Sequence, residues 1–241
     1  ILGLTIDYGP FGFLDAFDPN HICNHSDDHG RYSWNNQPQI GYWNLRALAQ
    51  ALLPLIPVAK DDSQIVIDVL QTYEQRFPQA MRARWRAKLG LQAEQEDDGK
   101  LAVELLQAMA AGKADFTITF RRLGDFRSDV APDHPANAPV RDLFLDRAAF
   151  DAWALRYSER LKAEGSVDAE RAARMRRVNP VYVLRNHMAQ VAIQRAQKGD
   201  YSEVQRLYLL LQTPFDEQPG AEADAGFPPE WAQAIEVSCS S

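Results

Sequence analysis

The sequence predicts a mainly α-helical fold that is preceded by one short strand and a long loop. From 40 to 213, apolar residues recur with helical spacing, and capping residues stand where helices begin and end. The first residues differ, because the apolar run 1–6 ends at Asp7 and is followed by Gly9 and Pro10. A short apolar run bounded by Gly and Pro is typical of a buried strand. We therefore expect a strand that ends at the carboxylate of Asp7, then a loop, then helices.

Asp7 is the first candidate functional residue. A carboxylate at a strand end is held rigidly, and it is a hard oxygen ligand of the kind that Mg²⁺ takes beside nucleotide phosphates. The sequence Asp-Tyr-Gly has the form of the kinase motif Asp-Phe-Gly, whose Asp holds Mg²⁺. Taken alone, an Asp at such a turn is more often structural.

Residues 8 to 39 are rich in Gly, Pro, Asn, Asp and His, which predicts a long ordered loop. The loop contains a possible zinc-ligand set: His21, Cys23, His25 and His29. Their spacing is unlike that of a structural zinc site, so we expect these side chains to bond the loop's own backbone. The loop carboxylates could also reach a metal site, but loop capping is the favoured role: Asp15, Asp18, Asp27 and Asp28.

The first predicted helices follow the loop. We expect a buried helix over 43–53, a second helix capped by Asp62 and Ser63 that ends near Phe77, and a third that restarts at Pro78 and ends at Gly90. Residues 101–111 form the next helix. The β-branched run 114–123 has strand propensity, yet its helical neighbours favour a helix.

The second half of the chain repeats this pattern after a Pro- and Asp-rich loop at 124–142. We expect a long helix capped by Asp146 and ending near Gly165, a helix over 167–178, a helix begun by Asn179 and Pro180 that ends near Lys198, and a last helix over 201–212 capped by Asp200. The tail carries apolar residues that can dock on the body: Phe215, Phe227, Trp231 and Ile235.

Several motifs resemble those of the selenoprotein O family (YdiU in bacteria), a family of protein adenylyltransferase pseudokinases. The resemblance is carried by residues 3–15, 17–27, 36–38, 179–186 and 237–241, and it runs over the whole chain. It implies the C-terminal lobe of a protein-kinase-like fold and transfer of AMP from ATP to Ser, Thr or Tyr hydroxyls of proteins. It also implies that Asp7 binds Mg²⁺ or Mn²⁺ and ATP.

The resemblance further implies an organisation in three parts. Residues 1–39 would form the metal-binding strand end and an activation-segment-like loop, 40–213 the helical C-terminal lobe, and 214–241 a tail. Family members are about twice as long, and their ATP-binding lobe and catalytic Asp-Asn pair precede the position of Ile1. We therefore expect the C-terminal half of such an enzyme, inactive alone, whose partners are the N-terminal half, ATP and protein substrates.

Cys23 and Cys239 are the two cysteines of the chain. In the family the position near the C-terminus is redox-active, which implies an intramolecular disulfide with regulatory effect. The alternative is two free thiols, the usual state in a reducing cytosol. The location implied is the bacterial cytoplasm, or the mitochondrion in a eukaryote.

The charge balance argues against a general nucleic-acid or membrane-surface role. The 241 residues include 26 Lys and Arg against 33 Asp and Glu, a formal net charge of −7. Two basic clusters, 82–88 and 171–177, are interpreted as solvated helix faces. No apolar run approaches the ~20 residues of a membrane helix.

Two other functions stay open from the residues alone. Residues 40–241 also have the pattern of a helical regulatory or binding module without catalysis of its own. The kinase-like Asp7 also permits part of an ordinary protein kinase, although the resemblance points to AMP transfer.

Overall fold

The computed structural model describes residues 12–55 and 63–237, and in these residues the fold is mainly α, as predicted. The helices are α1 (Gln37–Leu52), α2 (Ser63–Lys88), α3 (Asp98–Gly112), α4 (Phe116–Leu123), α5 (Ala138–Arg141), α6 (Arg147–Ala163), α7 (Asp168–Arg176), α8 (Asn186–Ala196) and α9 (Ser202–Leu210). Short 3₁₀ turns lie at Trp34–Asn36, Leu53–Leu55, Pro135–Asn137 and Glu230–Ala234. The described part of the chain contains no strand, but only an isolated bridge between Ala16 and Asp115. The predicted strand at 1–6 lies outside the described residues.

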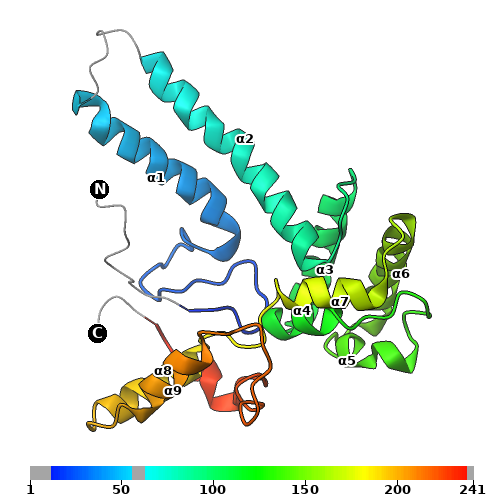
Figure 1. The fold of residues 1–241 in the computed structure, drawn as a ribbon. Helices are drawn as coiled ribbons and strands as arrows, with labels where there is room; N and C mark the ends of the chain where they lie inside the picture. The colour runs from blue at the N-terminus through cyan, green and yellow to red at the C-terminus, as the bar shows by residue number, and fades with distance from the viewer. Residues whose placement is uncertain (1–11, 56–62, 238–241) are drawn as a thin grey trace.

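The helices form three groups (Figure 1). The long helices α1 and α2 run side by side away from the body, α3 to α7 make the body, and α8 and α9 form a hairpin beyond it. The loop that begins at residue 12 passes between these groups. In the described residues no helix is long and apolar enough to cross a membrane.

The core of the body is built around α6. Trp153 and Tyr157 stack with ring centroids 4.9 Å apart, and both side chains are fully buried. Their polar atoms are also satisfied, because Trp153 Nε1 donates to the carbonyl of Leu101 at 2.8 Å and the Tyr157 hydroxyl to that of Leu89 at 2.6 Å. Burying an aromatic side chain contributes about 1.5–3 kcal/mol, so α6 fixes the body around it.

Helix α4 contains the β-branched run 116–120, which confirms the predicted helix. The side chain of Asp115 accepts a hydrogen bond from the N–H of Ile118 at 2.8 Å and so caps the helix. Ile118, Phe120 and Leu123 are buried in or against the body. Packing therefore overrides the strand propensity of this run.

Two predictions about the α1–α2 pair are wrong. No residue of α1 is buried, although a buried helix was expected. Pro78 does not separate two helices but lies inside α2. Tyr73, one turn before the proline, donates its hydroxyl to the carbonyl of Pro38 at 2.9 Å and stacks on Tyr42 of α1 and on Phe77. These contacts hold α2 together on the side that faces α1.

The predicted helix start at Asn179 and Pro180 is also wrong. The side chain of Asn179 is buried and engaged by Lys88: its amide donates to the Lys88 carbonyl at 2.9 Å, and its oxygen accepts from Lys88 Nζ at 3.0 Å. The amide therefore cannot cap a helix. The next residues run without regular structure, and α8 begins only at Asn186.

Candidate functional site

The segment 12–17, which follows the Asp-Tyr-Gly motif in sequence, is held against the N-terminus of α4. The N–H of Phe17 donates to the carbonyl of Ala114 at 2.9 Å, and the N–H of Phe116 donates to that of Asp15 at 2.8 Å. The side chain of Phe17 is 2% exposed and contacts Trp34 edge-on. The segment is therefore part of the packed body.

Arg185, the residue before α8, lies at the centre of this contact. Its guanidinium donates to both oxygens of Asp115, at 2.8 and 3.2 Å, and to Asp15 as well. The side chains of Arg185 and Asp115 are 2% and 4% exposed. Burial alone would lower the pKa of Arg185, but the hydrogen bonds to Asp115 and Asp15 reverse this and raise it. Arg185 shows no local signal for this role in the sequence, and Asp15, which was expected to cap the loop, instead pairs with Arg185.

Asn186 contacts the same segment at its other end. A Cβ atom on Gly12 would lie 2.6 Å from Oδ1 of Asn186, so a larger residue at position 12 would displace this amide. The thiol of Cys23 lies 3.8 Å from the carbonyl oxygen of Gly12. Neighbouring residues at the start of α8 thus contact the segment at positions 12 and 15.

The loop borders an open cavity of about 460 Å³ beside this segment. It is lined by Gly12, Leu14, His21, Cys23, Asn24, Tyr32, Trp34 and Gln37. Cys23 is a free, partly buried thiol, and burial raises its pKa. The thiol is therefore less reactive than an exposed one at neutral pH.

The other predicted site residues either cap the loop or lie outside the residues that the structure describes. Asp18 accepts from the N–H of Asn20 at 2.8 Å, and Asp27 accepts from two backbone N–H groups, as expected. In the part of the chain that the structure describes, no three His, Cys, Asp or Glu side chains are grouped to hold a metal ion. Asp7 and Cys239 lie outside the described residues.

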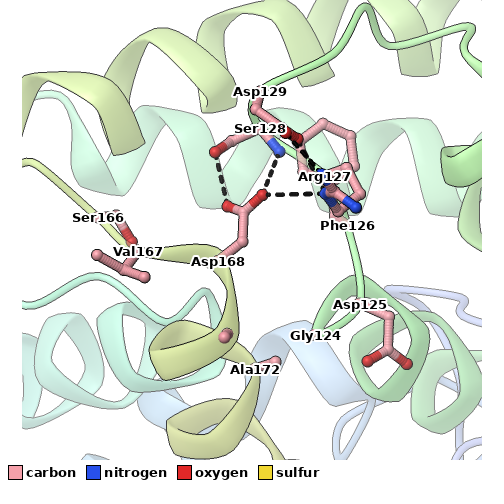
Figure 2. A pocket seen from close by; sticks show the side chains of 11 residues that line it. Gly124, Asp125, Phe126, Arg127, Ser128, Asp129, Ser166, Val167, Asp168 and Ala172 are labelled. Carbon is pink, nitrogen blue, oxygen red and sulfur yellow. Dashed lines mark hydrogen bonds and ion pairs between the residues drawn. The ribbon is translucent and has the colours of Figure 1, made fainter.

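A second cavity, of about 510 Å³, lies between the loop after α4 and the start of α7 (Figure 2). Asp168 on its wall accepts hydrogen bonds from the N–H and hydroxyl of Ser128, at 2.9 and 2.6 Å. Although burial would raise the pKa of Asp168, the bonds from Ser128 and the charge of Arg171 lower it. The carboxylate stays ionised and is engaged by Ser128 and Arg171, as expected of a structural group.

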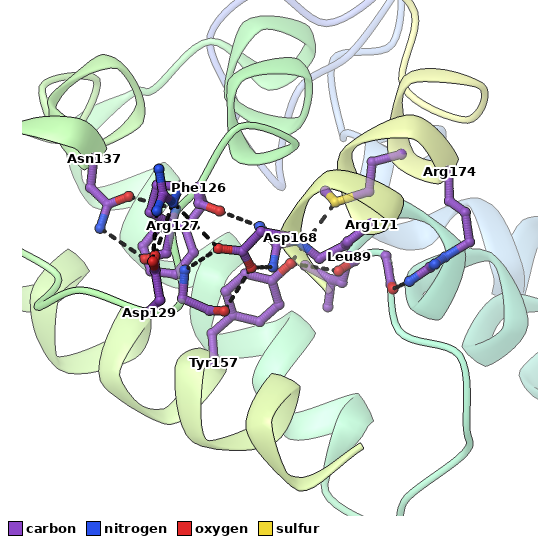
Figure 3. A network of polar contacts seen from close by, with 12 residues as sticks. Leu89, Phe126, Arg127, Asp129, Asn137, Tyr157, Asp168, Arg171 and Arg174 are labelled. Carbon is purple, nitrogen blue, oxygen red and sulfur yellow. Dashed lines mark hydrogen bonds and ion pairs between the residues drawn. The ribbon is translucent and has the colours of Figure 1, made fainter. Parts of the chain in front are cut away.

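Arg171 joins this carboxylate to the core (Figure 3). Its guanidinium donates to Asp168 and to the carbonyl of Phe126, and its side chain is fully buried. The prediction that the cluster 171–177 is a solvated face is therefore wrong at Arg171. In the other cluster Lys88 is also partly buried, with Nζ 4.5 Å from the centre of the Phe120 ring.

The C-terminal tail contacts the body through aromatic side chains, although Phe227 and Trp231 remain about half exposed, at 56% and 50%. Trp231 meets His187 of α8 edge-on at 6.1 Å, and Phe227 lies under the guanidinium of Arg122. The tail then reaches the loop, where the N–H of His25 donates to the carbonyl of Val237 at 2.9 Å. Loop, helical body and tail therefore meet around the segment 12–17.

The described residues thus form a mainly helical assembly that holds the segment following the Asp-Tyr-Gly motif of the sequence. A family model described as "Protein adenylyltransferase SelO" matches residues 1–212, and the chain belongs to this family. The chain is 57% identical over its whole length to the "Protein nucleotidyltransferase YdiU" of Burkholderia ambifaria, and 56% identical to the proteins of that name from Burkholderia vietnamiensis and Burkholderia multivorans. It covers 48% of each of these proteins, so the chain spans about half the length of the curated relatives it matches.

Proposed function

We propose that this chain is the C-terminal part of a protein adenylyltransferase that transfers AMP from ATP to Ser, Thr or Tyr hydroxyls of protein substrates. The observation that carries the proposal is the 57% identity along the entire chain to a protein nucleotidyltransferase. In this proposal 40–213 is the C-terminal lobe of a kinase-like fold, 1–39 supplies the metal-binding strand end and activation-segment-like loop, and 214–241 is the tail.

Asp7 is the proposed ligand for Mg²⁺ or Mn²⁺ and the contact to ATP within this chain. A carboxylate is the donor that these ions prefer, so the residue type fits the ion. A divalent ion there would neutralise the charge that develops at the transferred phosphorus. The chain's own contribution is to hold the segment that follows Asp7, through the contacts of Asp15 and Phe17 to the start of α4.

Redox control by Cys23 and Cys239 is the finer part of the proposal. The hydrogen bond from His25 to Val237 supports it, because each of these residues is two positions from one of the cysteines. Two residues of chain span at most about 7 Å. Reduction would then release the tail and open the loop to a protein substrate.

The test uses the full-length protein that contains this chain. The protein is incubated with ATP, Mg²⁺ and candidate substrate proteins, and modified peptides are identified by mass spectrometry. Addition of an adenylyl group to a hydroxyl supports the proposal. Addition of a phosphoryl group would instead identify a protein kinase, and a full-length protein that binds no nucleotide would favour the regulatory module.

A further inference from the structure

We propose that the apolar groove between α1 and α2 is the surface on which the N-terminal half of the full-length protein docks. The proposal rests on the proposed function only in taking this chain as the C-terminal part of a longer protein. It assigns no contact to ATP or to a metal ion. All the residues argued to form the groove lie in the part of the chain that the structure describes.

The groove has a volume of about 470 Å³ and lies between the two long helices that extend from the body (Figure 1). Its walls are aliphatic and recur at helical spacing in both helices. The main contributors are Leu45, Leu48 and Leu52 of α1 and Ile65, Val69 and Leu70 of α2. Among the described residues that line the groove, Arg76 is the one that carries a charge. The groove is therefore suited to an apolar occupant.

The groove is open to solvent in the described part of the chain. Val69 is 63% exposed, Ile65 49% and Leu48 41%. Toward the start of α1 the two helices close on each other, because Tyr73 stacks on Tyr42. Single exposed aliphatic side chains are ordinary, but a row of them on two adjoining helices marks an interaction surface.

The chemistry of the walls favours a permanent occupant over a passing protein substrate. Interfaces that stay together resemble a domain core that has been cut in half. Interfaces that form and separate are about as polar as the rest of a protein surface. The occupant is therefore a segment with its own aliphatic or aromatic face that folds together with this chain.

Tethering favours the N-terminal half over a second copy of the chain. The chain covers 48% of the length of its relative from Burkholderia ambifaria, so about as much chain again lies outside the structure. Gly12 lines the same cavity as Gln37, the first residue of α1, so the preceding chain joins beside the start of α1. The eleven residues before position 12 span at most about 40 Å, and α1 is about 24 Å long. A half tethered within reach of the groove acts at an effective concentration on the order of mM, which a second copy in solution does not reach.

Alkylation of single cysteines in the full-length protein measures whether the groove is covered. Val69→Cys places the thiol in the groove. Ile67→Cys is the matched control, because Ile67 is a β-branched residue of the same helix that is 43% exposed and is not among the residues that line the groove. We expect N-ethylmaleimide to label position 69 about 10-fold more slowly than position 67 or slower still, since a covered thiol reacts only when the interface opens locally.

Peptide mass spectrometry resolves these rates from those of the other cysteines. If Val69→Cys does not fold, Leu48→Cys takes its place on the α1 wall of the groove. Labelling at the groove position that is as fast as at position 67, or faster, overturns the proposal.

Photo-crosslinking identifies the occupant. The full-length protein is produced with photo-leucine, which has nearly the shape of leucine, and a mixture of isotopically light and heavy protein is irradiated. We expect cross-links from Leu48 and Leu52 to sequence that precedes Ile1 within the same copy. Cross-links between light and heavy copies at these leucines would identify a second copy instead, and cross-links confined to α1 and α2 would identify an uncovered groove; either result overturns the proposal.

Failure of the proposed function has a different signature. Neither measurement uses ATP or turnover, so a full-length protein that transfers a phosphoryl group, or that binds no nucleotide, refutes the proposed function without changing the labelling or the cross-links. Conversely, a groove that labels freely in a protein that transfers AMP overturns the docking proposal alone.

Discussion

The N–H of His25 donates to the carbonyl of Val237 at 2.9 Å, which joins the loop before α1 to the C-terminal tail. The two residues are far apart in sequence, and the bond closes most of the chain into a ring. It lies between the two regions that carry Cys23 and Cys239. The contact thus connects tail and loop without a covalent bond.

Oxidation is expected to join the loop and the tail covalently through a Cys23–Cys239 disulfide. The step removes two protons and two electrons from the thiols and requires an oxidant such as a small-molecule disulfide. Because burial raises the pKa of Cys23, the reaction should be slow at neutral pH and faster at alkaline pH. Non-reducing electrophoresis of the full-length protein measures the extent of oxidation. In the chain-entropy model, a disulfide that closes so long a loop raises the free energy of unfolding by about 5 kcal/mol.

The single variants Cys23→Ser and Cys239→Ser are the controls. The mobility shift of the oxidised protein should vanish in both and on addition of reductant. Two thiols that remain alkylatable after oxidation would contradict the prediction.

Replacing Asp7 by Ala in the full-length protein should abolish AMP transfer and leave the fold intact. A positioned divalent ion supplies several kcal/mol of transition-state stabilisation, so the rate should fall by about 10³-fold or more. Circular dichroism checks the fold and radiolabelled ATP measures the rate. Asp18→Ala, which removes a loop cap, is the control and should keep transfer; wild-type turnover in Asp7→Ala would refute the metal assignment.

The sequence predicted those helices whose ends are set by neighbouring residues. Asp146 caps α6 through the N–H of Ala149, and Gly165 follows it with φ of +66°, so both ends are encoded locally. The run 116–123 was assigned correctly because its helical neighbours were visible. Such signals act over a few residues and can be read from one sequence.

The errors arose where a distant residue decides the structure. Asn179 looked like a helix cap, yet its amide binds Lys88, 91 positions away. Arg185 carried no local signal, because its partners Asp15 and Asp115 are 170 and 70 positions away. Arg171 looked like a surface charge for the same reason. The motif Asp-Tyr-Gly indicated the kind of site. The side chains that hold the segment after the motif could be identified only from the three-dimensional structure.

The glycines after two helices allow a test of packing against α7. Gly90 and Gly165 both have positive φ, +70° and +66°. An added Cβ on Gly90 would meet Cγ of Arg171 at 2.5 Å and Sδ of Met175 at 2.7 Å, whereas nothing lies within 4 Å at Gly165. Gly165→Ala should therefore cost about 1–2 kcal/mol for the backbone alone. Gly90→Ala should cost a further ~1–3 kcal/mol for overpacking.

Thermal or denaturant unfolding of the full-length variants measures both changes. Equal losses at the two positions would show that α7 does not pack on Gly90 as described.

Lys88 should make stability rise with pH. Burial lowers the pKa of its ammonium group to about 8 from an ordinary value of 10.5. Between these values the unfolded chain holds the proton and the folded chain does not, so the free energy of unfolding increases as pH rises through this window. The gain is at most about 3 kcal/mol. The contacts of Nζ with Asn179 and the Phe120 ring favour the charged form of Lys88. These contacts therefore reduce the gain in unfolding free energy.

Lys88→Met removes the titrating group but keeps a side chain of similar length. The difference in unfolding free energy between wild type and this variant, measured from pH 7 to pH 10, should shift in favour of wild type above pH 8. Because other groups titrate in both proteins, the difference isolates Lys88. Lys100→Met, which removes an exposed lysine of α3, controls for the loss of a surface charge and should follow the wild-type profile. A wild-type to Lys88→Met difference that stays constant over this range would show that Lys88 remains charged in the fold, held by Asn179 and the aromatic rings.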